Sequence, residues 1–334
     1  MTPFELSRTV LRAVRRAVED GELSVAVPAR AVVTAPGPGG RGDYATNIAL
    51  QLARPAGRAP LEVAEILRPR LRDTDGVADV EITGPGFLNI HLEAAAATAA
   101  LVREIVDGGH GLRADGSTPY GHTARLADQV IPLRIPYDIR AEVVADTLVR
   151  IIATQGGRAE VHHARPGEAV DLRPVPAPED PTPLGPDAAR WALLYPAPHD
   201  RPRITADHLL QRESNPLFRI RYAHTRARAL GRNAGRLGFD AVPGDVPDVA
   251  PLTRALAEYP HALTQAAAHR APDRLARQLV AVADGLLAFQ HTVLPLGDEK
   301  PSAAHRARLA LAEAAGAVLA GGLSLLGISA PDYL

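Results

Sequence analysis

The chain has 334 residues, a formal net charge of −1, 46% hydrophobic residues, no cysteine and a single lysine, Lys300. This length predicts two or three domains. The absence of cysteine excludes disulfides, thiolate metal ligands and a thiol nucleophile, and the near-zero net charge excludes a global electrostatic attraction for nucleic acids, so only a local charge cluster would bind one.

Helical and strand patterns follow one another in the first 108 residues. Helices are predicted over 2–19, 45–52, 61–71 and 94–107, and strands over 77–82 and 87–92. In the second strand, Phe87, Asn89 and His91 alternate with apolar residues. This alternation predicts one core face and one face that displays a ring and hydrogen-bonding groups. The competing interpretation places Phe87 in the core.

The next segment predicts one strand–helix–strand unit, over 124–133, 139–154 and 158–164. Such a unit is a single crossover between parallel strands. One helix covers one face of the two strands, so we expect the other face to pack against a neighbouring domain. Between Arg173 and Gly185 the chain is rich in proline, which predicts a semi-rigid, extended linker.

The remaining segments are helical. A helix over 187–194 carries the only tryptophan, Trp191, which we interpret as an inter-domain packing residue. From about residue 205, apolar residues recur at steps of three and four between short connections, which predicts a helix bundle. The predicted fold class is therefore α+β and mainly helical. The predicted domains are an α+β domain at 1–108, a truncated βαβ segment with its linker at 109–185, and an all-α bundle at 186–334.

Neither a secretory signal nor an apolar run long enough to span a bilayer is recognised in the sequence. A cytoplasmic protein with no membrane partner is therefore expected.

Seven arginines gather between Arg212 and Arg236, where Glu213 is the one acidic residue. A helix over 217–235 sorts this stretch into three arcs. They are an apolar arc of Ile220, Ala223, Ala227 and Leu230 bordered by His224, a basic arc of Arg221, Arg228, Arg232 and Arg236, and a mixed arc of Arg219, Tyr222 and Arg226. An aromatic ring between two guanidinium groups is typical of a platform for an unstacked base and its phosphates. The alternative is a solvated arginine face with Tyr222 half-packed.

Four motifs resemble arginyl-tRNA synthetases and occur in the order of that family. They are Gly42–Ala49 (GDYATNIA), Gly84–Ile90 (GPGFLNI), Asn215–Ala227 (NPLFRIRYAHTRA) and Leu326–Leu334 (LGISAPDYL). The first two are similar to the extra N-terminal domain of the family, and the last two to its helical anticodon-binding domain. The resemblance implies that the chain binds tRNA with both ends.

The resemblance and the arcs together assign candidate tRNA-contacting residues. Anticodon contacts are expected from Arg219, Tyr222, Arg226 and Leu334, backbone contacts from Arg221, Arg228, Arg232 and Arg236, and elbow contacts from Tyr44, Asn47, Phe87 and Asn89. For Asn47 the alternative is a helix cap. Arg219 departs from the family, which tends to place an aromatic there, and Leu334 stands where the family usually ends in Met. The missing aromatic weakens the expectation of tight anticodon discrimination.

Neither ATP-binding signature of a class I synthetase is present. By resemblance the first signature falls on Ile135, Pro136, Tyr137 and Asp138, so it holds no histidine or glycine. Asp138 would place a carboxylate where helical amides face a triphosphate, and it is also a possible N-cap. The second signature needs a lysine on a mobile loop, whereas Lys300 lies near the far end of the chain.

The sequence therefore predicts a non-catalytic relative of arginyl-tRNA synthetase that binds tRNA, with an arginine tRNA as the expected partner. It would serve a separate synthetase or another tRNA-using enzyme. The alternative is a protein-docking subunit that has lost tRNA affinity, which the overall neutrality and Arg219 favour. An active ligase would need histidines and a lysine that the chain lacks. No cofactor is expected, and no metal, because the histidines form no helical pair with a nearby carboxylate.

Overall fold

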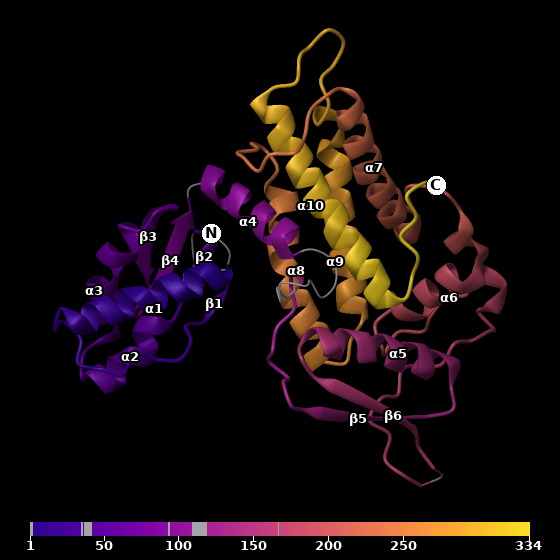
Figure 1. Ribbon diagram of the computed structural model, residues 1–334. Coiled ribbons are helices and arrows are strands. Elements are labelled where there is room, and N and C mark those ends of the chain that lie inside the picture. The colour runs from indigo at the N-terminus through magenta and orange to yellow at the C-terminus, as the bar shows by residue number, and fades with distance from the viewer. Residues whose placement is uncertain (1–2, 35, 37–41, 93, 109–118, 166) are drawn as a thin grey trace. The chain divides into compact units, whose positions relative to one another are not determined.

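The computed structural model describes residues 3–34, 36, 42–92, 94–108, 119–165 and 167–334. The chain forms two compact units, Met1–Leu101 and Val102–Leu334 (Figure 1). The predicted βαβ segment and the helix bundle both belong to the second unit. The boundaries predicted at residues 108 and 185 therefore stay predictions.

The first unit is an antiparallel sheet packed against helices, in the strand order β1-β2-β4-β3. Its elements are α1 (Pro3–Glu19), β1 (Val33–Thr34), β2 (Tyr44–Thr46), α2 (Ile48–Ala56), α3 (Pro60–Arg72), β3 (Val77–Thr83) and β4 (Phe87–Leu92). Leu88 and Ile90 of the central strand are fully buried in one core with Val10 and Leu67 from the helices. Two strands and two helices were thus predicted correctly. The helix expected from residue 45 begins only at Ile48, because Tyr44–Thr46 pair with β4.

Helix α4 (Ala94–Gly108) joins the two units in the chain, and the second unit then begins with a parallel pair of strands. The pair is β5 (Val130–Ile135) and β6 (Arg158–His163), connected by α5 (Ile139–Thr154). The crossover was predicted, although β5 starts six residues later than expected. Leu133 and Ile135 are buried on the face that α5 covers.

The other face of this two-stranded sheet carries Val130, Pro132 and Arg134 of β5 beside the charged side chains of β6. Arg158 is exposed and forms an ion pair with Glu160 at 2.6 Å, and His162 lies beside the same carboxylate. Solvated charges need no cover. The expectation that a neighbouring domain must pack on this face was therefore wrong, because its side chains are solvent-exposed, the apolar Val130 and Pro132 among them.

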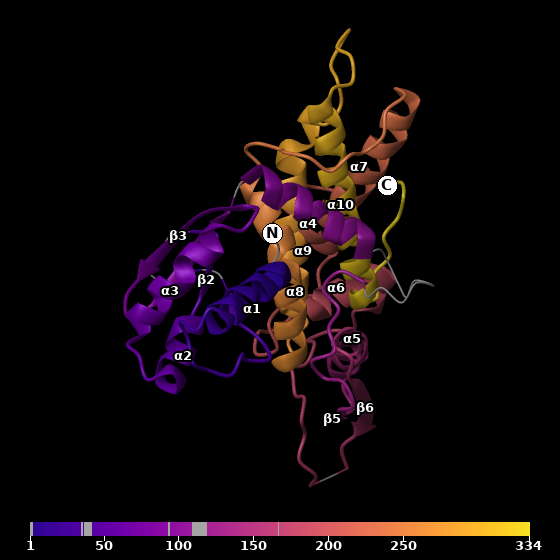
Figure 2. The same ribbon diagram turned by 60° about the vertical axis from the view of Figure 1, so that its left-hand side comes forward.

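The rest of the second unit is helical. Its elements are η1 (Thr182–Leu184), α6 (Gly185–Leu194), η2 (Ala206–Leu209), α7 (Pro216–Arg236), α8 (Ala250–Ala268), α9 (Asp273–Phe289), η3 (Gln290–Thr292) and α10 (Ala303–Leu326). Figures 1 and 2 show α7, α9 and α10 side by side, with α5 at one end of the bundle. Helix α6 packs on α5 and buries Trp191, whose ring stacks on Tyr195 at 4.8 Å. The mainly helical α+β class is confirmed.

One helix among the described residues, α10, is long and apolar enough to cross a membrane by length and composition. The expectation that no run reaches this length was wrong. Two thirds of its most apolar stretch (67%) is buried inside the protein, which is also typical of the core helix of a bundle.

Candidate nucleic-acid interface

Helix α7 carries the candidate anticodon-binding residues and starts at a well-formed cap. The Asn215 side chain accepts hydrogen bonds from the backbone N–H groups of Leu217 and Phe218, and Pro216 occupies the first helical position. The predicted apolar arc, including His224 at its border, is buried in the bundle. The basic arc and the mixed arc therefore lie on the outer sides of the helix.

The mixed arc of Arg219, Tyr222 and Arg226 is called the first row from here on, and it lies next to α9. Arg219 forms an ion pair with Asp284 at 3.3 Å, and Arg226 Nε donates to Gln290 Oε1 at 2.7 Å. The Arg226 guanidinium has five N–H donors, so this bond leaves the outer four for another acceptor. The row is held in place at both ends, and its charge is partly neutralised at Arg219.

Phe218 was missed by the sequence reasoning. Its ring stacks on Tyr222 with 5.6 Å between centroids and 18° between planes. The spacing of four residues on a helix was the available signal, since it places two side chains one above the other. Phe218 thus supplies a second ring one residue before Arg219, where the family tends to place its aromatic.

The second row, defined as Arg221, Arg228 and Arg232, binds the end of the chain. This end, the tail, is residues 327–334. Arg228 Nε lies 2.9 Å from a carboxylate oxygen of Asp332, and the Arg232 guanidinium lies 4.4 Å from the centre of the Tyr333 ring. Arg221 contacts Asp187 of α6 at 3.7 Å. Three of the four arginines expected to contact tRNA phosphates therefore hold the protein's own tail and α6.

The remaining residue of that arc, Arg236, lies exposed in the last turn of α7, and Leu334 is 52% exposed at the chain end. The Pro331 carbonyl accepts a hydrogen bond from Thr225 Oγ1 at 3.1 Å and lies 3.1 Å from His224 Nδ1. The tail thus runs along α7 as far as Tyr333, which Leu334 follows in the chain.

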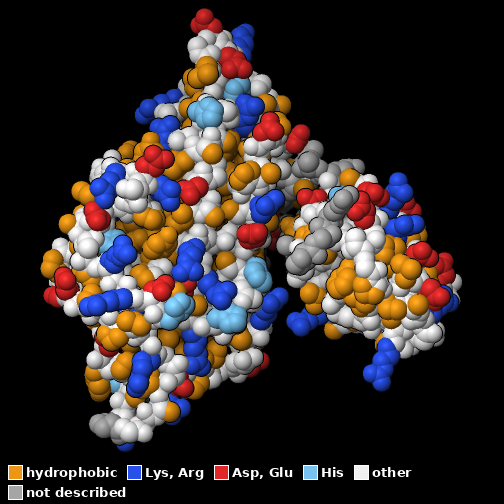
Figure 3. Space-filling model, turned by 180° about the vertical axis from the view of Figure 1, so that it is seen from behind, with side chains coloured by type: hydrophobic (Ala, Val, Ile, Leu, Met, Phe, Trp, Pro, Cys, Tyr) orange, Lys and Arg blue, Asp and Glu red, His pale blue; other side chains and the backbone are white. Residues whose placement is uncertain are grey.

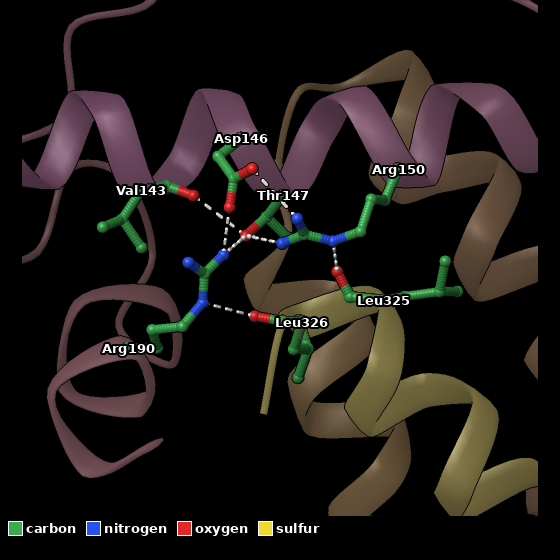
Figure 4. A network of polar contacts seen from close by, with 7 residues as sticks. All are labelled: Val143, Asp146, Thr147, Arg150, Arg190, Leu325 and Leu326. Carbon is green, nitrogen blue, oxygen red and sulfur yellow. Dashed lines mark hydrogen bonds and ion pairs between the residues drawn. The ribbon is translucent and has the colours of Figure 1, made fainter. Parts of the chain in front are cut away.

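The start of the tail is fixed by two arginines at the last turn of α10 (Figure 4). Arg150 Nε donates to the Leu325 carbonyl at 2.8 Å and Arg190 Nε to the Leu326 carbonyl at 2.9 Å, while Asp146 accepts from both guanidinium groups. Cations at this position satisfy the last carbonyls and the helix dipole. Gly327 follows with a φ of 71°, and a Cβ there would lie 2.6 Å from Arg190 Nε. Only glycine allows the chain to turn beneath this guanidinium.

The charges elsewhere are mixed. Figure 3 shows, on one face of the molecule, arginine side chains interspersed with aspartate and glutamate and no broad basic field. This distribution agrees with the net charge of −1. An attraction for nucleic acid must therefore come from local contacts.

The predicted elbow surface is only partly exposed. Phe87 is 41% exposed, but Asn89 is 1% exposed and donates to Thr83 Oγ1 at 2.6 Å. Tyr44 pairs with Ile90 and packs against the hydrophobic core of the first unit. The expectation that Asn89 and Tyr44 lie on the displayed face was wrong, because β4 is a central strand and Tyr44 belongs to its core side. Asn47 is half-buried at the N-cap of α2, makes no capping hydrogen bond, and accepts from Gln51 at 2.9 Å.

The degenerate ATP signature ends β5 and starts α5. Its last residue, Asp138, accepts from the Ala141 backbone N–H at 3.0 Å and so caps the helix. Tyr137 is 81% exposed and stacks on His163 at 4.2 Å. Ile135 is buried and Pro136 is half-buried. The first helical amides, which would receive a phosphate in a nucleotide-binding unit, already have an anionic partner.

Family models match both ends of the chain. Residues 5–92 match the arginyl-tRNA synthetase N-terminal domain, and residues 220–334 match the DALR anticodon-binding domain. Among curated relatives, the arginine–tRNA ligase of Renibacterium salmoninarum is 45% identical over 170 residues, which are 47% of this chain and 29% of that protein. The arginine–tRNA ligase of Frankia alni is 39% identical over 167 residues, which are 47% of this chain and 28% of that protein. The alignments thus cover under a third of these relatives.

Solved structures share the fold. The arginyl-tRNA synthetase of Thermus thermophilus superposes with a TM-score of 0.62 at 15% identity, over 100% of both chains. The Plasmodium falciparum enzyme superposes with a TM-score of 0.63 at 8% identity, over 99% of both chains. Together with the matched domains, these similarities show that the chain is related to the arginyl-tRNA synthetases through their N-terminal domain at residues 5–92 and their DALR anticodon-binding domain at residues 220–334.

Proposed function

We propose that this protein binds tRNA without aminoacylating it. The observation that carries the proposal is the first row on α7, where Tyr222 lies between Arg219 and Arg226 at the start of the region that matches the DALR anticodon-binding domain, residues 220–334. A flat ring offers a stacking surface to any base, and each stacked base contributes about 1–3 kcal/mol. The outer N–H groups of Arg226 are suited to a phosphate of the same nucleotide.

The tail extends this surface. Leu334 is exposed, and Arg232 holds the neighbouring Tyr333, which is 71% exposed. In the first unit, Phe87 is the one exposed ring of the predicted elbow surface, and Asn47 retains its amide N–H groups beyond the bond it accepts. An elbow contact through Phe87 and Asn47 is therefore part of the proposal.

Aminoacylation is not part of this function, because the position that would receive ATP carries Asp138. Its carboxylate caps α5 and repels a triphosphate. The single lysine, Lys300, follows η3 and lies in the connection to α10. We infer that the protein carries an arginine tRNA in the cytoplasm to a separate synthetase or another tRNA-using enzyme.

The test is tRNA binding by fluorescence anisotropy with the full chain at several salt concentrations. An arginine tRNA is compared with an unrelated tRNA, and the unmodified protein with Tyr222→Ala plus Arg226→Ala. Arg212→Ala is the matched control, because Arg212 is exposed and paired with Asp207 at 2.8 Å away from the first row. We expect micromolar or tighter binding that the double variant weakens and the control leaves unchanged.

The protein-docking alternative is favoured by one observation, the ion pairs that neutralise Arg219, Arg221 and Arg228. Absence of binding at low salt would refute the tRNA proposal and support a docking subunit. A preference for the arginine tRNA would establish anticodon reading, whereas equal binding of both tRNAs would restrict the function to tRNA binding without selection.

A further inference from the structure

The outer edge of β6 is an unpaired strand edge. The Arg158 N–H donates to Gln129 at 2.9 Å and the Ala164 N–H to Ile135 at 2.8 Å, so even-numbered residues of β6 direct their backbone groups toward β5. The backbone groups of Ala159, Val161 and His163 therefore point outward. In the part of the chain that the structure describes, no backbone group pairs with them. An edge of this kind is a template for another strand.

The opposite edge of the same sheet is closed. The edge of β6 is therefore the edge of this sheet that is available to another strand. On β5, Pro132 lacks the N–H that a neighbouring strand would use. The backbone of Arg134 is occupied on both sides, because its N–H donates to Asp171 Oδ2 at 3.0 Å and its carbonyl accepts from the Asp171 N–H at 2.9 Å. β6 contains neither a proline nor a lysine that would block pairing.

The charge pattern of β6 is complementary to itself in antiparallel orientation. With Val161 on a two-fold axis, Val161 faces its own copy, and Glu160 faces His162 of the second copy. Residues 159 and 163 face each other. The outward backbone groups then form hydrogen-bonded pairs at 161–161, 159–163 and 163–159. Glu160 and His162 fall in the closer, non-hydrogen-bonded pairs, where opposite charges on side chains attract.

A shift of register removes this complementarity. With Glu160 on the axis, two Glu160 carboxylates would face each other and Arg158 would face His162 of the second copy. Both pairs bring like charges together when the imidazole is protonated, although the outward backbone groups of residues 159 and 161 would still pair in this register. Both registers use the open edge, and the one centred on Val161 is the one that pairs opposite charges.

We propose that two copies of this chain associate through antiparallel pairing of β6 with β6, centred on Val161. The product is a continuous four-stranded sheet in the order β5-β6-β6-β5. Since each copy contributes only a short strand, the dimer dissociates on dilution. The inference is independent of tRNA binding.

Cysteine cross-linking tests the register directly, because the natural chain has no cysteine. Residues in a hydrogen-bonded antiparallel pair have Cα atoms about 5.5 Å apart, which a disulfide can span. Val161→Cys should therefore form a covalent dimer under mild oxidation. Ala159→Cys is the matched control, since residue 159 of the second copy lies about 13 Å farther along the strand. It should stay monomeric in the same gel.

The molecular mass of the cysteine-free protein in solution gives the second readout, by sedimentation over a range of concentrations. We expect a mass that rises from 35.3 kDa toward twice that value. Glu160→Lys should weaken the association at least tenfold, and Glu160→Lys with His162→Glu should restore it by exchanging the paired charges. Asp79→Lys makes the same charge change on an exposed residue of β3 and should have no effect. Circular dichroism checks that each variant is folded.

A monomer at every concentration, with no cross-link from Val161→Cys, would overturn the proposal. So would a dimer that cross-links equally through residues 159 and 161, or one that Glu160→Lys leaves intact, because either result places the interface elsewhere.

Discussion

Replacing Arg140 with methionine should be among the most damaging single changes in the second unit. Arg140 lies in the first turn of α5, is fully buried, and donates five hydrogen bonds to backbone carbonyls. The acceptors are Leu193 at 3.0 Å, Val175 at 2.7 Å, Pro196 at 3.0 Å, Ala197 at 2.9 Å and Asp200 at 2.7 Å. Burial lowers the pKa of this guanidinium, and Asp138, Asp200 and Asp273 oppose that shift with their charges.

The cost can be estimated from the carbonyls that water cannot reach. Leu193 is buried, and its carbonyl loses its only described partner when the guanidinium is removed, whereas the buried Ala197 carbonyl also accepts from the Asp200 N–H at 2.9 Å. An orphaned buried acceptor costs about 1–3 kcal/mol. Methionine fills much of the volume, and the other three acceptors can recover water. We therefore expect Arg140→Met to lower the free energy of unfolding by at least about 2 kcal/mol, the central cost of one orphaned buried acceptor.

Urea denaturation monitored by Trp191 fluorescence is the assay. The only tryptophan is fully buried in α6, two residues before an acceptor of Arg140, so it reports the unfolding of this region. Arg140→Lys keeps the charge but has three donors. It should lower the free energy of unfolding by about half as much as Arg140→Met. Arg212→Met, at an exposed ion pair, should lose less than about 1 kcal/mol. If Arg140→Met and Arg212→Met lower the free energy of unfolding equally, the hydrogen bonds from Arg140 to the five backbone carbonyls do not stabilise the fold.

Three further results are expected. Gly316→Ala should lower the melting temperature, because the new Cβ would lie 2.7 Å from a side chain of α7, an overpacking that costs about 1–3 kcal/mol. Gly235→Ala is the control: its new Cβ would have nothing within 4 Å, and the higher helix propensity of alanine should raise the melting temperature slightly. Burial alone would raise the pKa of Asp146. The hydrogen bonds and charges of Arg150 and Arg190 outweigh burial, so the pKa of this carboxyl is lowered. Since its folded pKa lies below the unfolded value of about 3.9, Asp146→Asn should reduce stability at pH 7, and titration should show the difference from the natural protein vanishing as the pH falls below about 4. ATP–pyrophosphate exchange with arginine should stay at the background rate, and exchange above it would contradict a non-catalytic role.

Local signals in the sequence predicted the elements whose ends are fixed by nearby residues. Helix α5 was predicted with both ends correct, because Asp138 caps its start and two glycines follow its last turn. The sequence of α1 does not by itself define the face that the helix buries. Leu11 and Val18 are half-buried, whereas Leu6 and Val10 are completely buried. Several registers fit an amphipathic helix of this composition, and the packing against α3 and the sheet selects one.

The candidate site shows the same division between local and distant information. The arcs of α7 follow from helix geometry, and the structure reproduces the buried one. The partners of the arginines do not follow from it, because Arg228 and Asp332 are 104 residues apart and Arg219 and Asp284 are 65 apart. Phe87 and Asn89 have the alternation of an exposed strand face, but burial of Asn89 depends on strands on both sides of β4.

The ion pairs of α7 determine how strongly salt should weaken tRNA binding. Seven arginines lie between residues 212 and 236, and four of them, Arg212, Arg219, Arg221 and Arg228, form ion pairs with aspartates. If those pairs persist in the complex, about three arginines bind phosphates, and the affinity should fall with a slope of about 2–3 in a plot of log K against log salt. If tRNA displaced the aspartates, about seven contacts would give a slope near 5–6. Because an opened pair exchanges one anionic partner for another, the attraction gained per phosphate would be small, and we expect the lower slope. A measured slope above about 5 would show that the tail and α9 release their arginines to the nucleic acid.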